Sequence, residues 1–194
     1  MARLITFGCS FTYGHYLELE QTAPSPLAWP SKLGTLLGME VINNAIPGAS
    51  NLEILLSIFK FKFLKDDVVV VGWTHPFRDF LIQQQKQIGP WTAEAESLSN
   101  LYSNKDMAVR SGLYISHAEL YLDSNSLKQQ HFLAPKTFTI MEFIQRVVKP
   151  IPVVKLKHYT NNIIIPDKDT ALDNQHPGPQ SHLLAAKRLY ELLK

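Results

Sequence analysis

Residues 66–75 read DDVVVVGWTH, and they decide the fold class of this chain. Four consecutive valines stand between two aspartates and a glycine. A short, unbroken run of β-branched residues is typical of a strand that is covered on both faces. Such strands occur in parallel sheets, because the helices that connect parallel strands pack on both faces of the sheet. We therefore expect a central parallel strand here.

The segments before this strand predict alternating strands and helices. Residues 3–8 (RLITFG) form an apolar run that stops at glycine, and residues 39–48 (MEVINNAIPG) predict a strand that breaks at Pro-Gly. Residues 25–38 and 50–63 carry apolar residues at helical spacing. This alternation predicts an α/β fold whose central parallel sheet has about four or five strands.

The second half of the chain has weaker patterns. An irregular or partly helical insertion is expected around 76–135, and residues 181–194 predict an amphipathic helix at the end. Within the insertion we predict a helix at 113–133, and after it a helix at 137–148, a strand at 151–157, and a strand or ordered loop at 161–166. No repeat or linker interrupts the 194 residues, so one domain is expected over 1–194.

Composition disfavours several classes of protein. The net charge is +2, which gives no field to recruit nucleic acid or an anionic membrane. The single cysteine precludes an internal disulfide, and the histidines lack metal-ligand spacing. No apolar stretch approaches the roughly 18 residues that a membrane span needs. The apolar run near the N-terminus is also too short for the core of a signal peptide. We expect a cytoplasmic protein of undetermined oligomeric state, without metal, nucleic-acid or membrane partners.

Three glycine-containing turns follow the predicted strands, at residues 8–10, 47–49 and 72–75. In an open α/β sheet, ligands bind beyond the carboxyl ends of the strands, so these turns should meet at one site. A fourth polar segment, DNQHPGPQSH at 173–182, precedes the last helix. The chemistry of the protein is therefore expected where these four segments come together.

The residue types in the four segments predict nucleophilic catalysis. Ser10 can attack a carbonyl when a base takes its proton, and His176 has the best surroundings for that role. Asp173 lies three residues before His176 and can orient the imidazole. The backbone amides of Ser10 and Gly48, together with the Thr74 hydroxyl, are candidates for an oxyanion hole.

The four segments resemble the sequence blocks of the SGNH (GDSL-like) hydrolases, a superfamily of esterases and lipases. The matching stretches, in chain order, are FGCSFTYG, NNAIPGASN, VVVVGWTH and DNQHP. The resemblance implies a three-layer α/β/α, flavodoxin-like fold and an esterase that needs no cofactor. It places Ser10 as the nucleophile, Asp173 and His176 as its triad partners, and Gly48 as an oxyanion donor. Compact relatives encoded by phages suggest a phage origin, with host cytoplasm or virion as the location.

Several positions depart from the family blocks. Cys9 replaces the aspartate of the nucleophile block, Thr74 replaces the asparagine that donates to the oxyanion, and His75 replaces an aspartate. A hydroxyl is shorter than a carboxamide, so Thr74 is the change that bears on activity. Candidates for contacting substrate beside this turn are Trp73, His75 and Arg78. Asn51 is interpreted as a helix cap.

Alternatives stay open for the individual residues. Taken alone, Ser10 is consistent with an ordinary turn residue, whereas the other three blocks favour the catalytic role. Cys9 is the rival nucleophile if a helix N-terminus activates it. Strand alternation, however, would point Cys9 away from Ser10 into the core. Asp167 or Asp169 could supply the carboxylate in place of Asp173.

Alternatives also stay open for the function. An esterase acting on small acyl esters, with O-acetyl groups on carbohydrate preferred, is the first hypothesis. The second is a binding or structural protein that kept the fold while the Thr74 change impaired the oxyanion hole. The third is a nucleotide or flavin binder, although the first turn lacks repeated glycines and Phe11 and Tyr13 would crowd a phosphate.

Overall fold

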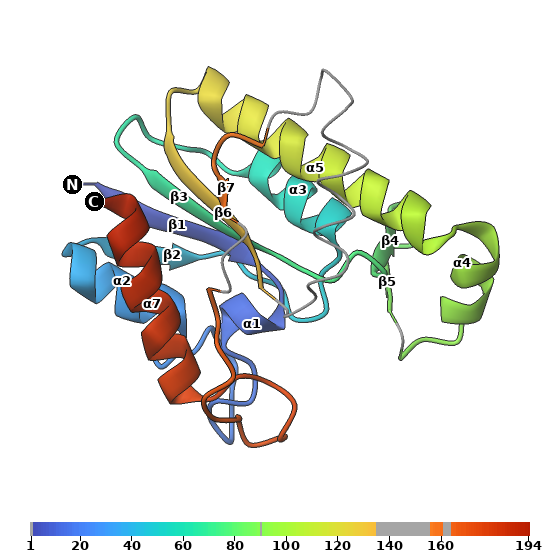
Figure 1. Ribbon diagram of the computed structural model, residues 1–194, viewed down its shortest axis with the longest axis horizontal. Helices are drawn as coiled ribbons and strands as arrows, with labels where there is room; N and C mark the ends of the chain where they lie inside the picture. Colours follow the sequence, from blue (N-terminus) through green and yellow to red (C-terminus); the bar gives the residue numbers. More distant parts are fainter. Residues whose placement is uncertain (1, 90, 135–155, 161–163) are drawn as a thin grey trace.

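The structure, a computed structural model, describes residues 2–89, 91–134, 156–160 and 164–194. A parallel sheet of five strands in the order β2-β1-β3-β6-β7 forms its centre (Figure 1). The strands are β1 (Arg3–Gly8), β2 (Glu40–Asn43), β3 (Val68–Trp73), β6 (Lys128–Leu133) and β7 (Tyr159–Thr160). The predicted parallel sheet is therefore confirmed.

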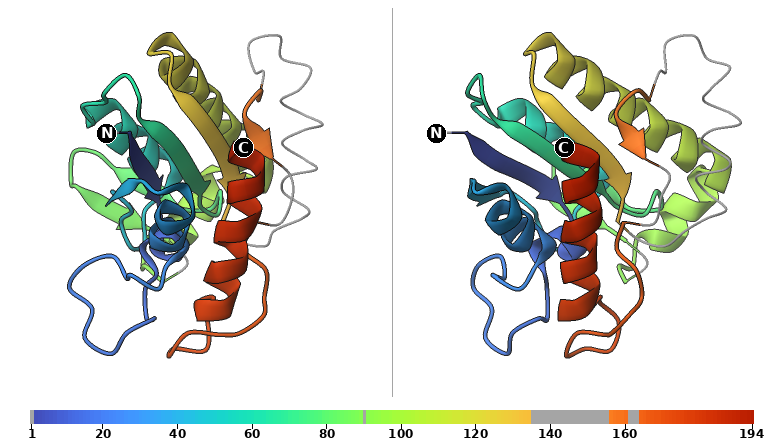
Figure 2. Two further views of the ribbon diagram at one scale, coloured as in Figure 1. Left: turned by 90° about the vertical axis from the view of Figure 1, so that its left-hand side faces the viewer. Right: turned by 60° about the vertical axis from the view of Figure 1, so that its left-hand side comes forward.

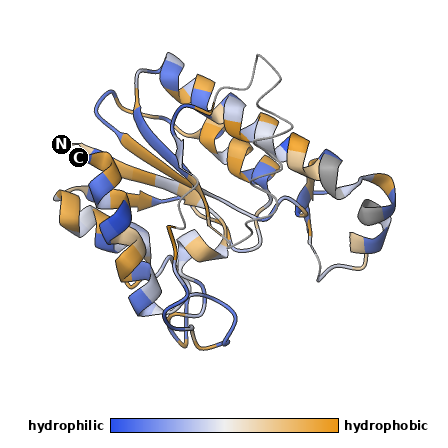
Figure 3. Cartoon of the chain, in the orientation of Figure 1, coloured by the Kyte–Doolittle hydropathy of each residue, from blue (hydrophilic) through white to orange (hydrophobic). Residues whose placement is uncertain are grey.

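β3 is buried along its whole length, in the middle of the sheet. Val69 and Val71 belong to the hydrophobic cluster on one face, and Val68 and Val70 belong to the cluster on the other. The four valines thus fill both cores at once, which is why the run shows no polar alternation. Figure 3 shows the apolar colour that β1 and β3 share.

Helices cover both faces of the sheet and complete a three-layer α/β/α fold. α2 (Trp29–Leu37) and α7 (Pro179–Leu193) pack together on one face, whereas α3 (Asn51–Lys60) and α5 (Asn104–Ser124) pack on the other (Figure 2). In the part of the chain that the structure describes, no helix is long and apolar enough to cross a membrane.

Part of the segment 76–135 projects beyond the carboxyl edge of the sheet. β4 (Asp79–Leu81) and β5 (Lys86–Ile88) form an antiparallel hairpin, and α4 (Ala95–Leu101) follows it (Figure 1). The rest of the segment returns to the core, because α5 and β6 belong to the central layers. The hairpin lies next to the turns that follow β2 and β3, and therefore next to the candidate site.

The fourth strand corrects one sequence prediction. Residues 128–133 were expected to be helical, but they form β6 between β3 and β7. Their sequence, KQQHFL, is polar where a central strand is normally apolar, as Figure 3 shows. The polar side chains are tolerated because they bond to one another: His131 Nε2 lies 2.8 Å from Gln129 Oε1, and Gln129 Nε2 donates to the Glu119 carbonyl at 3.1 Å.

The remaining predictions for this region fall partly on residues outside the described ranges. The helix expected at 137–148 lies wholly outside them, as do residues 151–155 and 161–163 of the two expected strands. Residues 156–157 and 164–166 are described and are not strand. The fifth strand, β7, instead occupies residues 159–160, between the two predicted segments.

A buried histidine joins the two helices on one face of the sheet, and it predicts a pH-dependent stability. The fully buried His182 in α7 accepts a hydrogen bond on Nδ1 from the backbone N–H of Trp29, at 3.1 Å. Burial lowers the pKa of His182 from 6.5 to about 4. As the pH falls below 6.5, His182 is protonated in the unfolded chain but stays neutral in the folded chain. The free energy of unfolding therefore decreases until the pH reaches about 4.

The expected loss from this one group is about 3 kcal/mol between pH 7 and pH 4. His182→Asn keeps an acceptor near the Nδ1 position but cannot titrate, so its unfolding free energy should fall less steeply over the same range. Urea unfolding of both proteins at several pH values measures the difference. Parallel pH profiles for the two proteins would contradict the assignment.

Candidate active site

The predicted turns meet at the carboxyl edge of the sheet. Ser10 begins α1 (Ser10–Tyr13) directly after β1, Gly48 lies in the turn after β2, and Thr74 follows β3 (Figure 1). Parallel neighbours bring these three strand ends together, and the Ile46 N–H donates to the Gly8 carbonyl at 2.9 Å. Three of the four candidate segments therefore share one edge of the fold.

Ser10 is positioned by an unusually close turn. A Cβ on Gly8 would lie 2.1 Å from Thr12 Oγ1 and 2.8 Å from the Gly72 carbonyl oxygen, so the chain can turn there only without a side chain. The Ser10 side chain is largely buried at the first position of the helix. Cys9, its neighbour, is 1% exposed and packs in the core on the α3 face. Cys9 therefore lies in the core, as strand alternation predicts.

His176 and Asp173 form a tight pair in the loop before α7. His176 Nδ1 lies 2.6 Å from Asp173 Oδ2, and the backbone N–H groups of Gln175 and His176 both donate to Asp173 Oδ1 at 3.1 Å. Burial raises the pKa of Asp173, but the hydrogen bonds outweigh it and hold the pKa below its usual value. An ionised Asp173 keeps the proton on Nδ1 and leaves Nε2 of His176 able to accept one.

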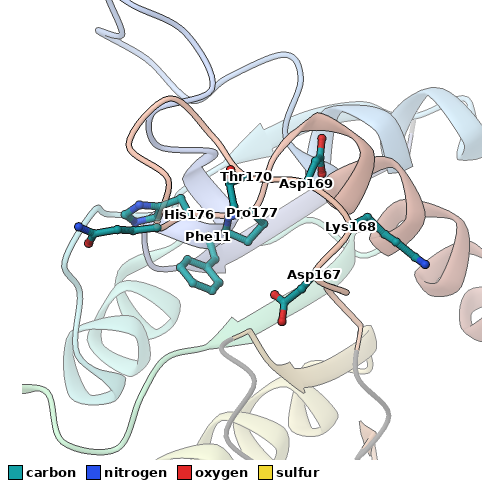
Figure 4. A pocket seen from close by; sticks show the side chains of 8 residues that line it. Phe11, Asp167, Lys168, Asp169, Thr170, His176 and Pro177 are labelled. Atoms are coloured by element: carbon teal, nitrogen blue, oxygen red, sulfur yellow. The ribbon is translucent and has the colours of Figure 1, made fainter.

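Aromatic side chains from the segment around Ser10 surround the His176 ring. The ring centroids of Phe11, Tyr16 and His15 lie 5.3, 5.4 and 5.8 Å from it. Phe11 is the residue after Ser10, and Figure 4 shows Phe11 and His176 side by side. Burial, followed by the proximity of His176, lowers the pKa of His15. The structure thus brings the fourth candidate segment to the helix that carries Ser10.

Gly48 adopts a backbone conformation that favours glycine. Its φ is +81°, and a Cβ there would lie 2.4 Å from Oε1 of Gln87 on β5. Gln87 also donates to the carbonyl of Pro47 at 3.3 Å and to Glu53 Oε2 at 2.9 Å. The β4–β5 hairpin therefore holds the turn that contains Gly48.

Thr74 is fully buried, and none of the described residues makes a hydrogen bond to its hydroxyl. The Asn51 side chain makes two hydrogen bonds to the backbone of Thr74. The Thr74 N–H donates to Asn51 Oδ1 at 2.8 Å, and Asn51 Nδ2 donates to the Thr74 carbonyl at 3.1 Å. The interpretation of Asn51 as a helix cap is wrong, because Ser50 caps α3 by accepting from the Glu53 N–H. Nothing in the spacing of the sequence could have paired Asn51 with Thr74.

The three residues expected beside Thr74 differ in their access to a substrate. Trp73 is fully buried, and its Nε1 donates to His131 Nδ1 at 3.1 Å, so it belongs to the core and does not line the site. His75 is partly exposed, and burial followed by the charge of Arg78 lowers its pKa. Arg78 is also partly exposed, with its guanidinium 4.8 Å from the ring centroid of Trp91.

A pocket of about 260 Å³ opens beside His176 (Figure 4). Its lining comes from α1 and from the two loops that precede α7: Phe11, Asp167, Lys168, Asp169, Thr170, Gln175, His176 and Pro177. Asp169 accepts from the N–H groups of Gln180 and Ser181, both at 2.8 Å, so its carboxylate caps α7. Of the candidate carboxylates, Asp173 is the one bonded to His176.

Similar folds occur among solved structures of ester hydrolases, although no family model and no curated protein matches the sequence. A putative lipolytic protein of the G-D-S-L family from Desulfitobacterium hafniense is 15% identical, with a TM-score of 0.57 over 98% of this chain and 99% of that one. The acetyl xylan esterase Est2A from the rumen bacterium Butyrivibrio proteoclasticus is 13% identical, with a TM-score of 0.65 over 99% of this chain.

A third similar structure is a carbohydrate esterase whose active site is described as having divergent catalytic and non-catalytic binding functions. It is 20% identical, with a TM-score of 0.60 over 97% of this chain. The chain spans 64% of that esterase and 63% of Est2A, less than two thirds of each. These likenesses establish the fold: the chain has the three-layer architecture of the SGNH, or GDSL-like, hydrolases.

Proposed function

We propose that this protein is a serine esterase that cleaves a carboxylic ester through Ser10, His176 and Asp173. The observation that carries the proposal is the His176–Asp173 pair, joined at 2.6 Å and packed on the aromatic residue that follows Ser10. A loop histidine with a half-buried aspartate on one ring nitrogen, packed against the residue that follows a serine, supplies the base and the orienting carboxylate that a serine nucleophile needs.

The reaction would proceed in two steps. Ser10 Oγ attacks the ester carbonyl while His176 Nε2 takes its proton, and Asp173 stabilises the imidazolium that forms. The oxyanion accepts hydrogen bonds from the N–H groups of Ser10 and Gly48 and from the Thr74 hydroxyl. The C–O bond to the alcohol then breaks, and His176 returns the proton to the leaving oxygen. Water attacks the acyl-Ser10 ester in the same way and releases the acid.

The substrate that we favour is a small acyl ester of a carbohydrate. The pocket beside His176, at about 260 Å³, lies just below the range typical of drug-sized ligand sites, which suits a small group. Est2A, one of the proteins with a similar fold, is an acetyl xylan esterase. His75 and Arg78 are partly exposed beside Thr74 and would contact the sugar that carries the acyl group.

The direct test is hydrolysis of p-nitrophenyl acetate and butyrate by the purified protein, with a fluorophosphonate reagent as a second probe. We expect turnover of the acetate ester and covalent modification of Ser10, located by peptide mass spectrometry. Modification of Cys9 instead would make the thiol the nucleophile. Absence of both turnover and modification, in a folded protein, would reject the esterase.

A non-catalytic binding protein is the second candidate function, and Thr74 is the observation that favours it. A hydroxyl reaches less far than the carboxamide it replaces, so the oxyanion hole would be weaker. Against this candidate, the His176–Asp173 pair keeps the geometry of a catalytic base. A folded protein that binds acetylated sugars without turnover would support the second candidate.

The substitution Thr74→Val should have opposite effects on stability and on activity. Thr74→Val has nearly the same shape but removes a buried hydroxyl that has no partner among the residues with described positions. We expect the variant to unfold at equal or higher temperature, since an unsatisfied buried hydroxyl costs about 1–3 kcal/mol. The value of kcat for ester hydrolysis should fall by about 10²-fold, because one oxyanion donor is lost.

The matched control is Thr74→Ser, which keeps the hydroxyl and loses only a methyl group. It should retain kcat within several-fold while its melting temperature falls, the reverse of the Thr74→Val result. Unchanged kcat in Thr74→Val would remove Thr74 from the oxyanion hole.

A further inference from the structure

The guanidinium group of Arg78 lacks a hydrogen-bond acceptor in the part of the chain that the structure describes. Among the residues that the structure describes, no side chain or carbonyl accepts a hydrogen bond from it, and its Nη1 is buried without a partner. Arg3, by contrast, makes two bonds of 2.9 and 2.6 Å to Asp67. The carboxylate next to Arg78 in sequence, Asp79, is already used by Arg110 at 3.1 Å. The charge of Arg78 is therefore left uncompensated in a partly buried place.

The position of Arg78 is set by contacts on both sides. Its backbone N–H donates to the His75 carbonyl at 3.2 Å, which ties it to the end of β3. Its guanidinium lies over the Trp91 ring at 4.8 Å, a cation–π contact that holds the group without using its N–H donors. Arg78 is thus oriented while its hydrogen-bonding capacity stays free.

Trp91 connects Arg78 to the turn that holds Gly48. The indole Cζ2 lies 3.7 Å from the position of a Cβ on Gly48, and the ring lies so close to Gly89 that a Cβ there would be 2.4 Å from Cη2. The Trp91 side chain is nevertheless exposed, with a relative surface of 56%. An open aromatic surface therefore extends from the proposed oxyanion hole to the free guanidinium.

We propose that Arg78 and Trp91 form a subsite for an acidic carbohydrate, with the sugar on the indole and its anionic oxygens on the guanidinium. This assignment rests on the proposed esterase and names its substrate class: an acyl ester of a sugar that carries a carboxylate or a sulfate. Burying part of a positive charge without a partner costs free energy, and an anionic substrate would compensate the buried Nη1 of Arg78. The planar guanidinium offers two parallel N–H donors to such a group.

The test compares acetylated methyl glucoside with acetylated methyl glucuronide, which differ by a carboxylate in place of a hydroxymethyl group. We expect kcat/KM to favour the glucuronide at least about tenfold, as a charge-assisted pair should give. Arg78→Gln should abolish the preference, so that the values of kcat/KM for the two esters lie within about twofold of each other. The sulfated glucoside, run in parallel, tells whether a carboxylate or a sulfate is preferred.

Lys86→Gln is the matched control, because it removes one positive charge from the hairpin that directly follows Arg78. Lys86 is already paired with Glu94 and is exposed, so the preference for the acidic sugar should survive its loss. Equal kcat/KM for the two esters in the parent protein would overturn the subsite. So would a preference that persists in Arg78→Gln, or one that Lys86→Gln removes equally, which would indicate net charge alone.

A binding measurement tests the acidic-sugar subsite independently of the proposed esterase activity. Calorimetric titration of the parent and of Arg78→Gln with methyl glucuronide and methyl glucoside needs no turnover. Selective binding of the glucuronide that disappears in Arg78→Gln would support the subsite even if no ester were cleaved. Hydrolysis of p-nitrophenyl acetate without selective binding would leave the esterase standing and reject the subsite.

Discussion

Ser10→Ala is expected to lower kcat for p-nitrophenyl acetate by about 10⁴-fold or more, because removal of the nucleophile leaves only binding and the oxyanion hole. The fold should be preserved, because Ser10 is the first residue of α1 and alanine favours a helix. The measurement is initial-rate kinetics of the parent and variant with circular dichroism to confirm folding.

Cys9→Ala is the matched control for the neighbouring thiol. Cys9 packs in the hydrophobic core, so its truncation should lower the melting temperature while kcat stays within a few-fold. The opposite pattern, with activity lost in Cys9→Ala and kept in Ser10→Ala, would make the protein a thiol esterase. Activity unchanged in both variants would reject this turn as the catalytic centre.

Asp173→Asn is expected to lower kcat by about 10⁴-fold, because it reverses the hydrogen bond to His176. The native carboxylate accepts at 2.6 Å from Nδ1, whereas an asparagine amide can present a donor and favour the wrong tautomer. The loop should keep its shape, since the side-chain oxygen that remains can still accept the N–H groups of Gln175 and His176. Steady-state kinetics with p-nitrophenyl acetate measures the loss.

Asp169→Asn tests the rival carboxylate of the same region. Asp169 caps α7 through the N–H groups of Gln180 and Ser181, so its neutralisation should cost about 1 kcal/mol of stability and leave kcat nearly unchanged. An Asp169→Asn variant as impaired as Asp173→Asn would mean that the carboxylate has been assigned to the wrong residue.

The strands with apolar runs were predictable because local composition and tertiary environment agree there. β1 occupies residues 3–8 as expected, and β3 lies within the quoted stretch at 66–75. β6 was missed because Gln129 and His131 are polar residues at buried positions of a central strand. Their burial depends on partners from α5 and β3, and no local pattern encodes such partners.

The candidate site was predictable to a similar degree. The glycine turns and the Asp173–His176 spacing are local features, since each turn must be made by the residues present in it. Other features of the site depend on contacts between different segments of the chain. Asn51 binds the backbone of Thr74, Trp73 donates to His131, and Arg78 contacts Trp91. Long-range contacts of this kind decide which side chains face a substrate.

By itself the sequence determined the class of fold and the order of its strand-end turns, because hydrophobic periodicity and glycine act over a few residues. It also placed an aspartate and a histidine close enough along the chain to pair. Only the tertiary structure decided that Trp73 is enclosed and that, among the described residues, the Thr74 hydroxyl has no partner and the charge of Arg78 is uncompensated. Burial and hydrogen bonding depend on what the rest of the chain brings to each atom, and packing alone sets that.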